Sequence, residues 1–169
     1  MSEIIKNDSI VEDAWNVLKL GEGDTPESVA LPEGSTLLPL TVWQARRDEI
    51  LAKNAPVGIW LDSHEGPEAI ADDLAHFAVI GVNFPKFADG RGYSTARLLR
   101  ERYHYRGELR AIGDVQRDQL FLLRRVGFDA FAVRADKDIR AALDGFRDFS
   151  ETYQGAVDQP QPLFHRRSA

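Results

Sequence analysis

Residues 57–82, VGIWLDSHEGPEAIADDLAHFAVIGV, contain two short apolar runs separated by a more polar stretch. Both runs, 57–61 and 77–82, are continuously apolar, which is typical of parallel strands that are covered on both faces. Between them, Pro67 and Glu68 favour the first turn of a helix, which we expect to run to about Leu74. This stretch therefore predicts one strand–helix–strand unit.

The same alternation continues on both sides of this unit. We expect further strands at 36–40, 109–112 and 128–133, and further helices at 42–53, 94–103, 114–125 and 136–149. From residue 57 onward the strands begin at intervals of about 20 to 32 residues, which requires crossover connections and a parallel sheet. The predicted fold class is α/β, with four to five β/α units that form either an open three-layer sheet or a partial barrel.

The chain divides into three predicted regions. Residues 1–35 form an N-terminal arm, with a β-hairpin that turns at Asn7-Asp8 and a following loop. Residues 36–150 form the α/β domain, and residues 151–169 form a C-terminal tail. A partial barrel leaves open sheet edges, which we expect the hairpin or a second copy of the chain, in a homodimer, to cover.

Composition excludes several classes of protein. With 43% apolar and 28% charged residues in 169, the chain is expected to be globular. It has no apolar run of membrane-spanning length, and its first residues lack a secretory signal pattern, so we expect a cytoplasmic protein without membrane contact. The absence of cysteine excludes disulfides and iron–sulfur ligation. The four histidines lack metal-ligand spacing, so no metal site is expected.

Charge is distributed unevenly along the chain. Residues 1–90 contain sixteen acidic and six basic residues, whereas residues 91–169 contain eleven acidic and fifteen basic residues. Ten arginines lie between Arg91 and Arg134, and the guanidinium fork suits sulfate, phosphate and carboxylate. The alternative is a salt-bridged helix surface. Interleaved acids and the lack of a recognition motif argue against nucleic acid.

Ligand sites of parallel α/β proteins lie beyond the carboxyl ends of the strands. Asp62 and Asp114 follow two of the predicted strands and are candidate catalytic carboxylates. Asp114 is equally well placed to cap the following helix. The candidate residues for binding a substrate or anion are Asn83, Asp89, Gly90, Arg91, Gly92, Tyr93, Ser94, Arg97, Gly113, Arg117 and Arg134.

The segment 83–97, NFPKFADGRGYSTAR, is the most informative of these. Gly90 and Gly92 permit positive φ and close backbone approach, and they lead into a helix expected to begin near Ser94. With Arg91 and Arg97, the free amides there would form an anion cradle. The alternative is a capped turn, and neither a Walker loop nor a dinucleotide fingerprint is present.

Three long patterns of unusual residues then carry a resemblance: F-x-DGRGYS (87–94), A-x-GDV-x-RDQL (111–120) and RR-x-GFDAFA (124–132). They are similar to the bacterial domain-of-unknown-function family 934 over roughly residues 36–150, and IIKNDSIVEDAW and PLFHRR near the two ends fit as well. This uncharacterised family is sometimes labelled a probable oxidoreductase. Its genes lie beside those for assimilatory sulfite reductase and phosphoadenylylsulfate reductase. The resemblance therefore implies a role in sulfate assimilation.

Two functions remain open from the sequence. The first is an accessory protein of assimilatory sulfite reduction, an oxidoreductase component with sirohaem sulfite reductase as its partner. Without cysteine, such a component needs a bound organic cofactor, and flavin and nicotinamide are the candidates. The second is a small independent α/β enzyme that binds a sulfate- or phosphate-bearing substrate at the strand ends.

Overall fold

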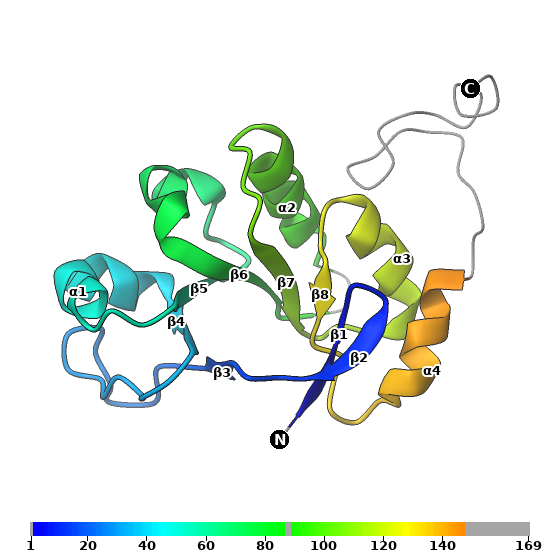
Figure 1. The fold of residues 1–169 in the computed structure, drawn as a ribbon, viewed down its shortest axis with the longest axis horizontal. Helices are drawn as coiled ribbons and strands as arrows, with labels where there is room; N and C mark the ends of the chain where they lie inside the picture. Colours follow the sequence, from blue (N-terminus) through cyan, green and yellow to red (C-terminus); the bar gives the residue numbers. More distant parts are fainter. Residues whose placement is uncertain (1, 87–88, 148–169) are drawn as a thin grey trace.

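The computed structural model describes residues 2–86 and 89–147, and shows one curved sheet with helices packed against it (Figure 1). In this part of the chain the sheet has eight strands, in the order β2-β1-β8-β7-β6-β5-β4-β3. The strands are β1 (Glu3–Lys6), β2 (Ser9–Glu12), β3 (Asn16–Val17), β4 (Thr36–Pro39), β5 (Val57–Leu61), β6 (Phe77–Phe84), β7 (Glu108–Gly113) and β8 (Ala130–Phe131). The helices are α1 (Leu40–Ala52), the 3-10 helix η1 (Pro67–His76), α2 (Arg91–Glu101), α3 (Arg117–Arg125), α4 (Ile139–Leu143) and the 3-10 helix η2 (Asp144–Arg147).

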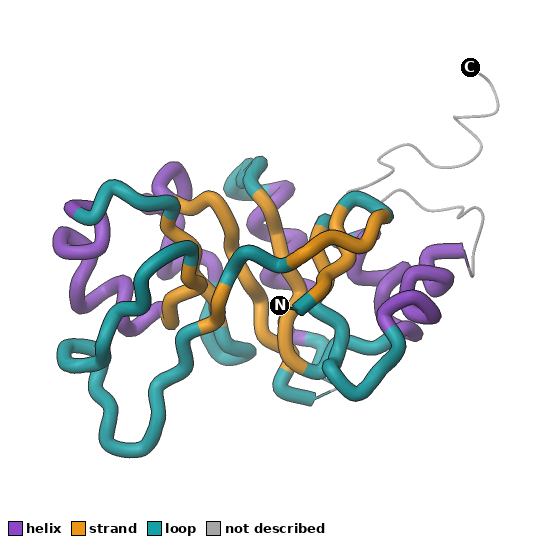
Figure 2. Tube along the Cα trace, turned by 60° about the horizontal axis from the view of Figure 1, so that its bottom comes forward, coloured by secondary structure: helices purple, strands orange, loops and turns teal. Residues whose placement is uncertain are grey.

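Strand order follows chain order through most of the sheet. From β3 to β8, each strand lies beside its successor and runs parallel to it. Right-handed crossovers then place every connecting helix on the same side of the sheet. Figures 1 and 2 show the helices along the outside of the curve. The sheet is therefore a curled half-barrel and not an open three-layer sheet.

The N-terminal residues, predicted as a separate arm, belong to this sheet. β2 pairs with β1, and β1 pairs with β8, in both cases antiparallel. Asn7 and Asp8 connect β1 to β2 with φ values of 50° and 64°. Positive φ at both positions gives a two-residue turn the twist that antiparallel neighbours need. The sheet is consequently mixed, with two antiparallel strands added to a parallel series.

The connection between β2 and β3 shows how strongly the sheet curls. These strands are the two outermost in the sheet, yet only residues 13–15 separate them. A flat sheet of eight strands would be about 34 Å wide. Four Cα steps, from Glu12 to Asn16, reach at most about 15 Å. The short link therefore crosses the open side of the half-barrel.

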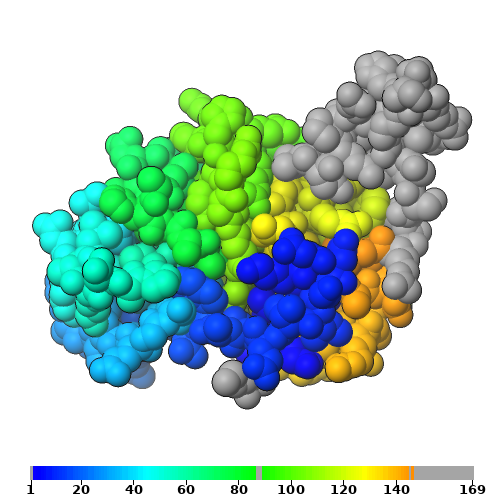
Figure 3. Space-filling view, viewed as in Figure 1, coloured from blue at the N-terminus to red at the C-terminus, as the bar shows by residue number. Residues whose placement is uncertain are grey.

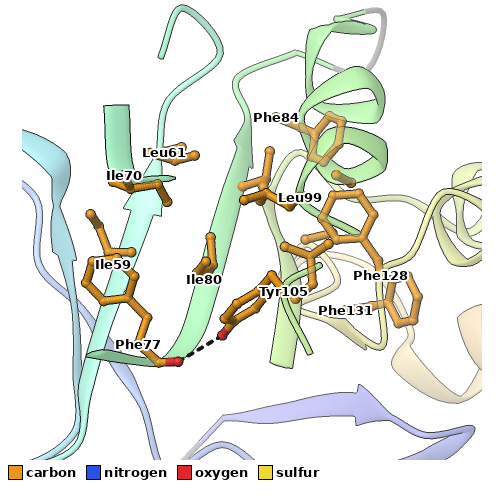
Figure 4. Close-up of a cluster of buried hydrophobic side chains, with 14 of the residues drawn as sticks. Ile59, Leu61, Ile70, Phe77, Ile80, Phe84, Leu99, Tyr105, Phe128 and Phe131 are labelled. Atoms are coloured by element: carbon orange, nitrogen blue, oxygen red, sulfur yellow. Dashed lines mark hydrogen bonds between the residues drawn. The ribbon is translucent and has the colours of Figure 1, made fainter. Parts of the chain in front are cut away.

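The main hydrophobic core lies between the sheet and the helices (Figure 4). Ile59 and Leu61 from β5 and Ile80 from β6 point toward the helices and are fully buried. Burying each such side chain contributes about 1.5–3 kcal/mol to the free energy of folding. The Tyr105 hydroxyl donates to the carbonyl of Phe77 (3.1 Å) and so satisfies its polar atom within this core.

The concave face is filled as well, because two strand positions there are glycine. A Cβ added at Gly58 would lie 2.6 Å from Leu37 and 2.7 Å from Trp15, and a Cβ at Gly81 would lie 3.3 Å from Leu37. Trp60, also on this face, donates its indole N–H to the carbonyl of Leu18 (2.9 Å). The segment after β2 thus packs into the curve of the sheet.

A buried group of charges fixes that segment in place. Arg110 of β7 is only 2% exposed, and its guanidinium contacts Asp13 (2.7 Å) and Glu108 (2.8 Å). Lys6 contacts the other oxygen of Glu108 (2.8 Å). Because Asp13 lies in the link between β2 and β3, this network ties the link to the middle of the sheet.

Two helices begin a few residues later than predicted, for identifiable reasons. α3 begins at Arg117 and not at Asp114, because Gln119 accepts a hydrogen bond from the amide of Gln116 (3.1 Å) and completes a capping box there. α4 begins after Asp138, which accepts from the amide of Arg140 (2.9 Å), and not after Asp136.

Other element boundaries also differ from those predicted. β8 has two residues in place of six, and β3, which is only two residues long, was missed. The predicted tail, 151–169, and the end of the predicted last helix lie outside the described residues.

Candidate functional site

The carboxyl ends of β5 to β8 bring together most of the polar residues singled out from the sequence. We call this surface the rim, and define it by eight residues: Asp62, Ser63, Asn83, Asp89, Arg91, Gly113, Asp114 and Arg134. Hydrogen bonds connect these residues across neighbouring strands.

Asp62 is the centre of one half of the rim. It follows β5, and its Oδ1 accepts from the amide of Ser63 (2.8 Å) and from Nδ2 of Asn83 (3.0 Å), at the neighbouring end of β6. Its own amide donates to Glu65 (2.8 Å). Among the described residues, Oδ2 of Asp62 has no hydrogen-bond partner. The carboxylate is therefore held by one oxygen and open at the other.

Arg91 lies beside this carboxylate. Its Nε and one terminal nitrogen contact the two oxygens of Asp89 (3.1 and 2.7 Å), and the same terminal nitrogen donates to the hydroxyl of Ser63 (2.9 Å). Hydrogen bonds from Arg91 hold the pKa of Asp89 at about 2. The side chain of Arg91 is 60% exposed, so its remaining N–H groups can reach a ligand.

The glycines of this segment have a different role from the one predicted. Gly90 has φ −89°, so the predicted positive φ is absent there, and Gly92 lies inside α2. A Cβ at Gly92 would lie 2.6 Å from the ring of Phe84, which shows that this glycine allows α2 to pack on β6. The first amide of α2 already donates to Asp89 (3.1 Å). The local sequence therefore builds a tightly packed helix start.

Asp114 is the centre of the other half of the rim. Its amide donates to the carbonyl of Phe84 (2.7 Å), which joins the ends of β7 and β6. Its Oδ1 accepts from Arg134 (3.0 Å) and from Gln116 (2.8 Å). Arg134 also contacts both oxygens of Asp136 (2.9 and 2.7 Å). Asp114 thus acts as an anchor for Arg134.

Gly113 lies between the two halves. Its φ is +92°, and a Cβ there would lie 2.5 Å from the carbonyl oxygen of Phe84 and would overlap Oδ1 of Asn83. Only glycine allows β7 to end so close to β6 and to the side chain that supports Asp62.

The remaining predicted site residues lie in or near the helices. Arg97 pairs with Glu101 along α2 (3.4 Å), away from the rim. Tyr93 is half-buried, its ring packs edge-on against Phe84, and burial raises the pKa of its hydroxyl. Ser94 is exposed within α2, and Arg117 is the exposed first residue of α3.

Sequence reasoning missed three contributors to the rim network. Ser63 follows a strand in the same way as Asp62, so the strand-end rule already contained the signal for it. Gln116 and Asp136 contact Asp114 and Arg134 only because of the turns after β7 and β8. No sequence motif marks those contacts.

A separate cavity of about 310 Å³ lies beside the β1–β2 turn, near the end of α3. It is lined by Asn7, Asp8, Arg124, Gly127, Phe128, Asp129 and Phe131.

The structure thus defines a half-barrel α/β protein with a polar rim of paired arginines and carboxylates. The order of β3 to β8 contains no reversal of the kind at which dinucleotides bind in open sheets. In the described part of the chain, no three histidine or carboxylate side chains gather as a metal site, and no helix has the length and apolarity that a membrane crossing requires.

The family described as "Bacterial protein of unknown function (DUF934)" matches residues 58–164, which is more than half of the chain. The chain therefore belongs to this family. A search of curated proteins gives no match. The matched region includes all eight rim residues.

Proposed function

We propose that the rim binds a small oxyanion-bearing substrate and that the chain is an α/β enzyme acting on it. The observation that carries this proposal is the position of Arg91. Its guanidinium is oriented by Asp89 and Ser63 but remains 60% exposed at the carboxyl ends of the strands. A guanidinium fixed in this way contacts an oxyanion with little further loss of side-chain freedom.

Asp62 is the residue we assign to proton transfer. Asn83 and the Ser63 amide hold one of its oxygens. Asp89 raises the pKa of Arg91, and the Asp62 carboxylate is close enough to add to this effect. The other oxygen of Asp62 is the one we assign to a ligand held by Arg91. Asp114 is a weaker candidate for this role, because Arg134 and Gln116 already contact its Oδ1. We therefore assign to Asp114 the positioning of Arg134.

The family resemblance narrows the choice of first ligands. It implies a place in sulfate assimilation, so sulfite and sulfate are the first ligands to test. Phosphate is the comparison anion. A sulfur oxyanion presents the oxygen acceptors that a guanidinium contacts best.

Thermal melts with these anions test the proposal. A ligand at one hundred times its dissociation constant stabilises the folded state by about 2.7 kcal/mol. Arg91→Ala should abolish this stabilisation. Arg97→Ala, which removes an exposed arginine of the same helix away from the rim, should retain it. The absence of any shift in the unaltered protein with all three anions would refute the proposal.

A second candidate function is an accessory protein that binds sulfite reductase, and the distribution of charge favours it. Residues 14–86 contain eleven acidic and five basic residues, whereas residues 91–147 contain eight acidic and thirteen basic residues. Because strand order follows chain order, these segments lie mainly on opposite sides of the molecule (Figure 3). Such a charge separation steers association with a partner, and the effect weakens with salt.

Affinity purification of the tagged chain from sulfate-grown cells tests this second function. A sirohaem absorbance spectrum in the eluate at low salt, and its loss at high salt, would support it. A colourless eluate at low salt would argue against a stable complex with the reductase, and a yellow eluate would indicate a flavin.

A further inference from the structure

The rim carries two exposed guanidinium groups at separate strand ends. Arg91 is held over the end of β5 by the hydroxyl of Ser63 (2.9 Å), and Arg134 is held at the end of β7 by Asp114 (3.0 Å). One strand, β6, lies between these two ends. Two strand spacings amount to about 10 Å, so the two groups are separated by about the length of a small extended molecule.

Among the residues that the structure describes, both guanidinium groups keep N–H donors beyond those already used in hydrogen bonds. A guanidinium has five N–H groups. Arg91 makes three hydrogen bonds through Nε and one terminal nitrogen, and Arg134 makes three through all of its nitrogens. The aspartates that accept these bonds fix the orientation of each group, and the two side chains remain 60% and 38% exposed. Each guanidinium can therefore donate hydrogen bonds to one oxyanion.

Asn83 and Gly113 lie at the ends of β6 and β7, on the line between the two guanidinium groups. Gly113 ends β7 without a side chain, and Asn83 at the end of β6 is directed toward Asp62. A ligand that contacts both arginines would cross the rim over these two residues, and Asp62, at the end of β5, would then lie beside the part of the ligand next to Arg91.

We infer that the substrate class is a small molecule with an anionic group at each end, about 10 Å apart. One oxyanion contacts Arg91 and the other contacts Arg134, while Asp62 lies beside the atoms next to the oxyanion at Arg91. This inference rests on the proposed function, because it identifies the second contact of the same site.

Calorimetric titration with synthetic disulfonates tests the inference. The probes are linear α,ω-alkanedisulfonates whose sulfur atoms are about 5 to 13 Å apart, a range that brackets two strand spacings, each compared with the monosulfonate of equal chain length. We expect the best disulfonate to bind at least tenfold more tightly than its monosulfonate. Arg91→Ala and Arg134→Ala should each remove this gain, whereas Arg97→Ala should retain it. Arg134→Lys keeps the charge and should recover part of the gain. This recovery would show that Arg134→Ala acts through the lost cation and not by disturbing the fold.

Three outcomes would overturn the inference. Equal binding of mono- and disulfonates would exclude a second contact but would leave the proposed oxyanion site intact. A gain that persists in Arg134→Ala would place the second contact elsewhere. No binding of any sulfonate, together with no thermal shift by sulfite, sulfate or phosphate, would refute the proposed function and this inference with it.

Discussion

Helix α2 carries an arginine–aspartate pair at each end, and the two pairs differ in almost every physical respect. At its start, Arg91 contacts Asp89 at 2.7 Å with a side chain that is 60% exposed. At its end, Arg100 lies 3.5 Å from Asp129 and is only 10% exposed. The first pair lies on the rim, and the second lies near the opposite ends of the strands.

The two environments act on the carboxylates in opposite directions. Hydrogen bonds from Arg91 lower the pKa of Asp89 to about 2, whereas burial raises the pKa of Asp129. Burial also lowers the pKa of Arg100. Hydrogen bonding thus has the largest effect on the pKa of Asp89, whereas desolvation has the largest effect on the pKa values of Asp129 and Arg100.

The contacts of Arg100 explain its burial. It donates to the carbonyls of Gly127 (2.9 Å), Tyr105 (2.8 Å) and Gly107 (2.8 Å), which lie in the segments before β8 and β7. Arg100 therefore joins three segments of the fold, whereas the side chain of Arg91 makes its hydrogen bonds, within the described part of the chain, to Asp89 and Ser63. The comparison indicates that one arginine of α2 is structural and that the other is available for a ligand.

The largest effect is expected from Arg100→Ala. The substitution leaves three carbonyls without the donor that Arg100 supplies and removes the ion-pair partner of Asp129. Each buried acceptor left unsatisfied costs about 1–3 kcal/mol. Arg100→Lys should recover only part of this loss, because one ammonium cannot reach all three carbonyls. Urea unfolding measures both. A loss below about 1 kcal/mol in Arg100→Ala would contradict the structural role.

Gly113→Ala is expected to have the next largest effect. The new Cβ would lie 2.5 Å from the carbonyl oxygen of Phe84, at a φ of +92° that side chains rarely adopt. A loss of about 1–3 kcal/mol in the free energy of unfolding is expected.

Gly90→Ala is the matched control for this glycine. Its φ is −89° and no atom lies within 4 Å of the new Cβ, so stability should rise by about 0.4–1 kcal/mol. Similar urea midpoints for the two alanine variants would show that the end of β7 is less constrained than the structure indicates.

The contributions of Asp129 and Asp89 to the stability of the fold should change with pH in opposite directions. Because the pKa of Asp129 is raised in the folded state, its contribution to stability is present at low pH and falls as pH rises from 3.8 through the raised pKa. Because the pKa of Asp89 is lowered to about 2, its contribution is complete above pH 3.8 and is lost as pH falls toward 2.

Carboxyl chemical shifts measured by NMR across pH 1.5 to about 7, a range that brackets both shifts, would give both pKa values directly. Urea unfolding of Asp129→Asn and Asp89→Asn beside the unaltered protein would give the corresponding slopes. The free energy of unfolding of each variant, subtracted from that of the unaltered protein at each pH, gives the contribution of that aspartate. Contributions that change with pH in the same direction would refute the assigned causes.

The parallel strands were predictable because each needs only a short continuous run of apolar residues, which is a local feature of the sequence. Runs such as 57–61 and 77–82 are apolar throughout, and a strand covered on both faces needs nothing more. β3 was missed because two residues carry no periodicity, and the link that leads into it is held by the ion pair between Asp13 and Arg110 across 97 residues. A contact of that kind is tertiary and leaves no trace in a sequence window.

In the candidate site too, the features that depend on local sequence were predictable, and those that depend on tertiary contacts were not. The strand-end rule located Asp62, Asn83 and Asp114, because it needs only the ends of strands. It did not show which arginines would be paired. That depends on the turns after β6 and β8, where Asp89 and Asp136 meet Arg91 and Arg134.

Arg91→Ala is expected to have the smallest effect on stability. Exposed ion pairs contribute little to folding, because water screens the charges and two side chains lose freedom. The urea midpoint should therefore fall only slightly, and by less than in Gly113→Ala, while the pKa of Asp89 returns toward its ordinary value of 3.8. A clear loss of stability in Arg91→Ala would make this arginine structural, like Arg100, and its loss of ligand stabilisation would then no longer identify a binding residue. A nearly unchanged midpoint together with a lost thermal shift would separate binding from folding at one end of a single helix.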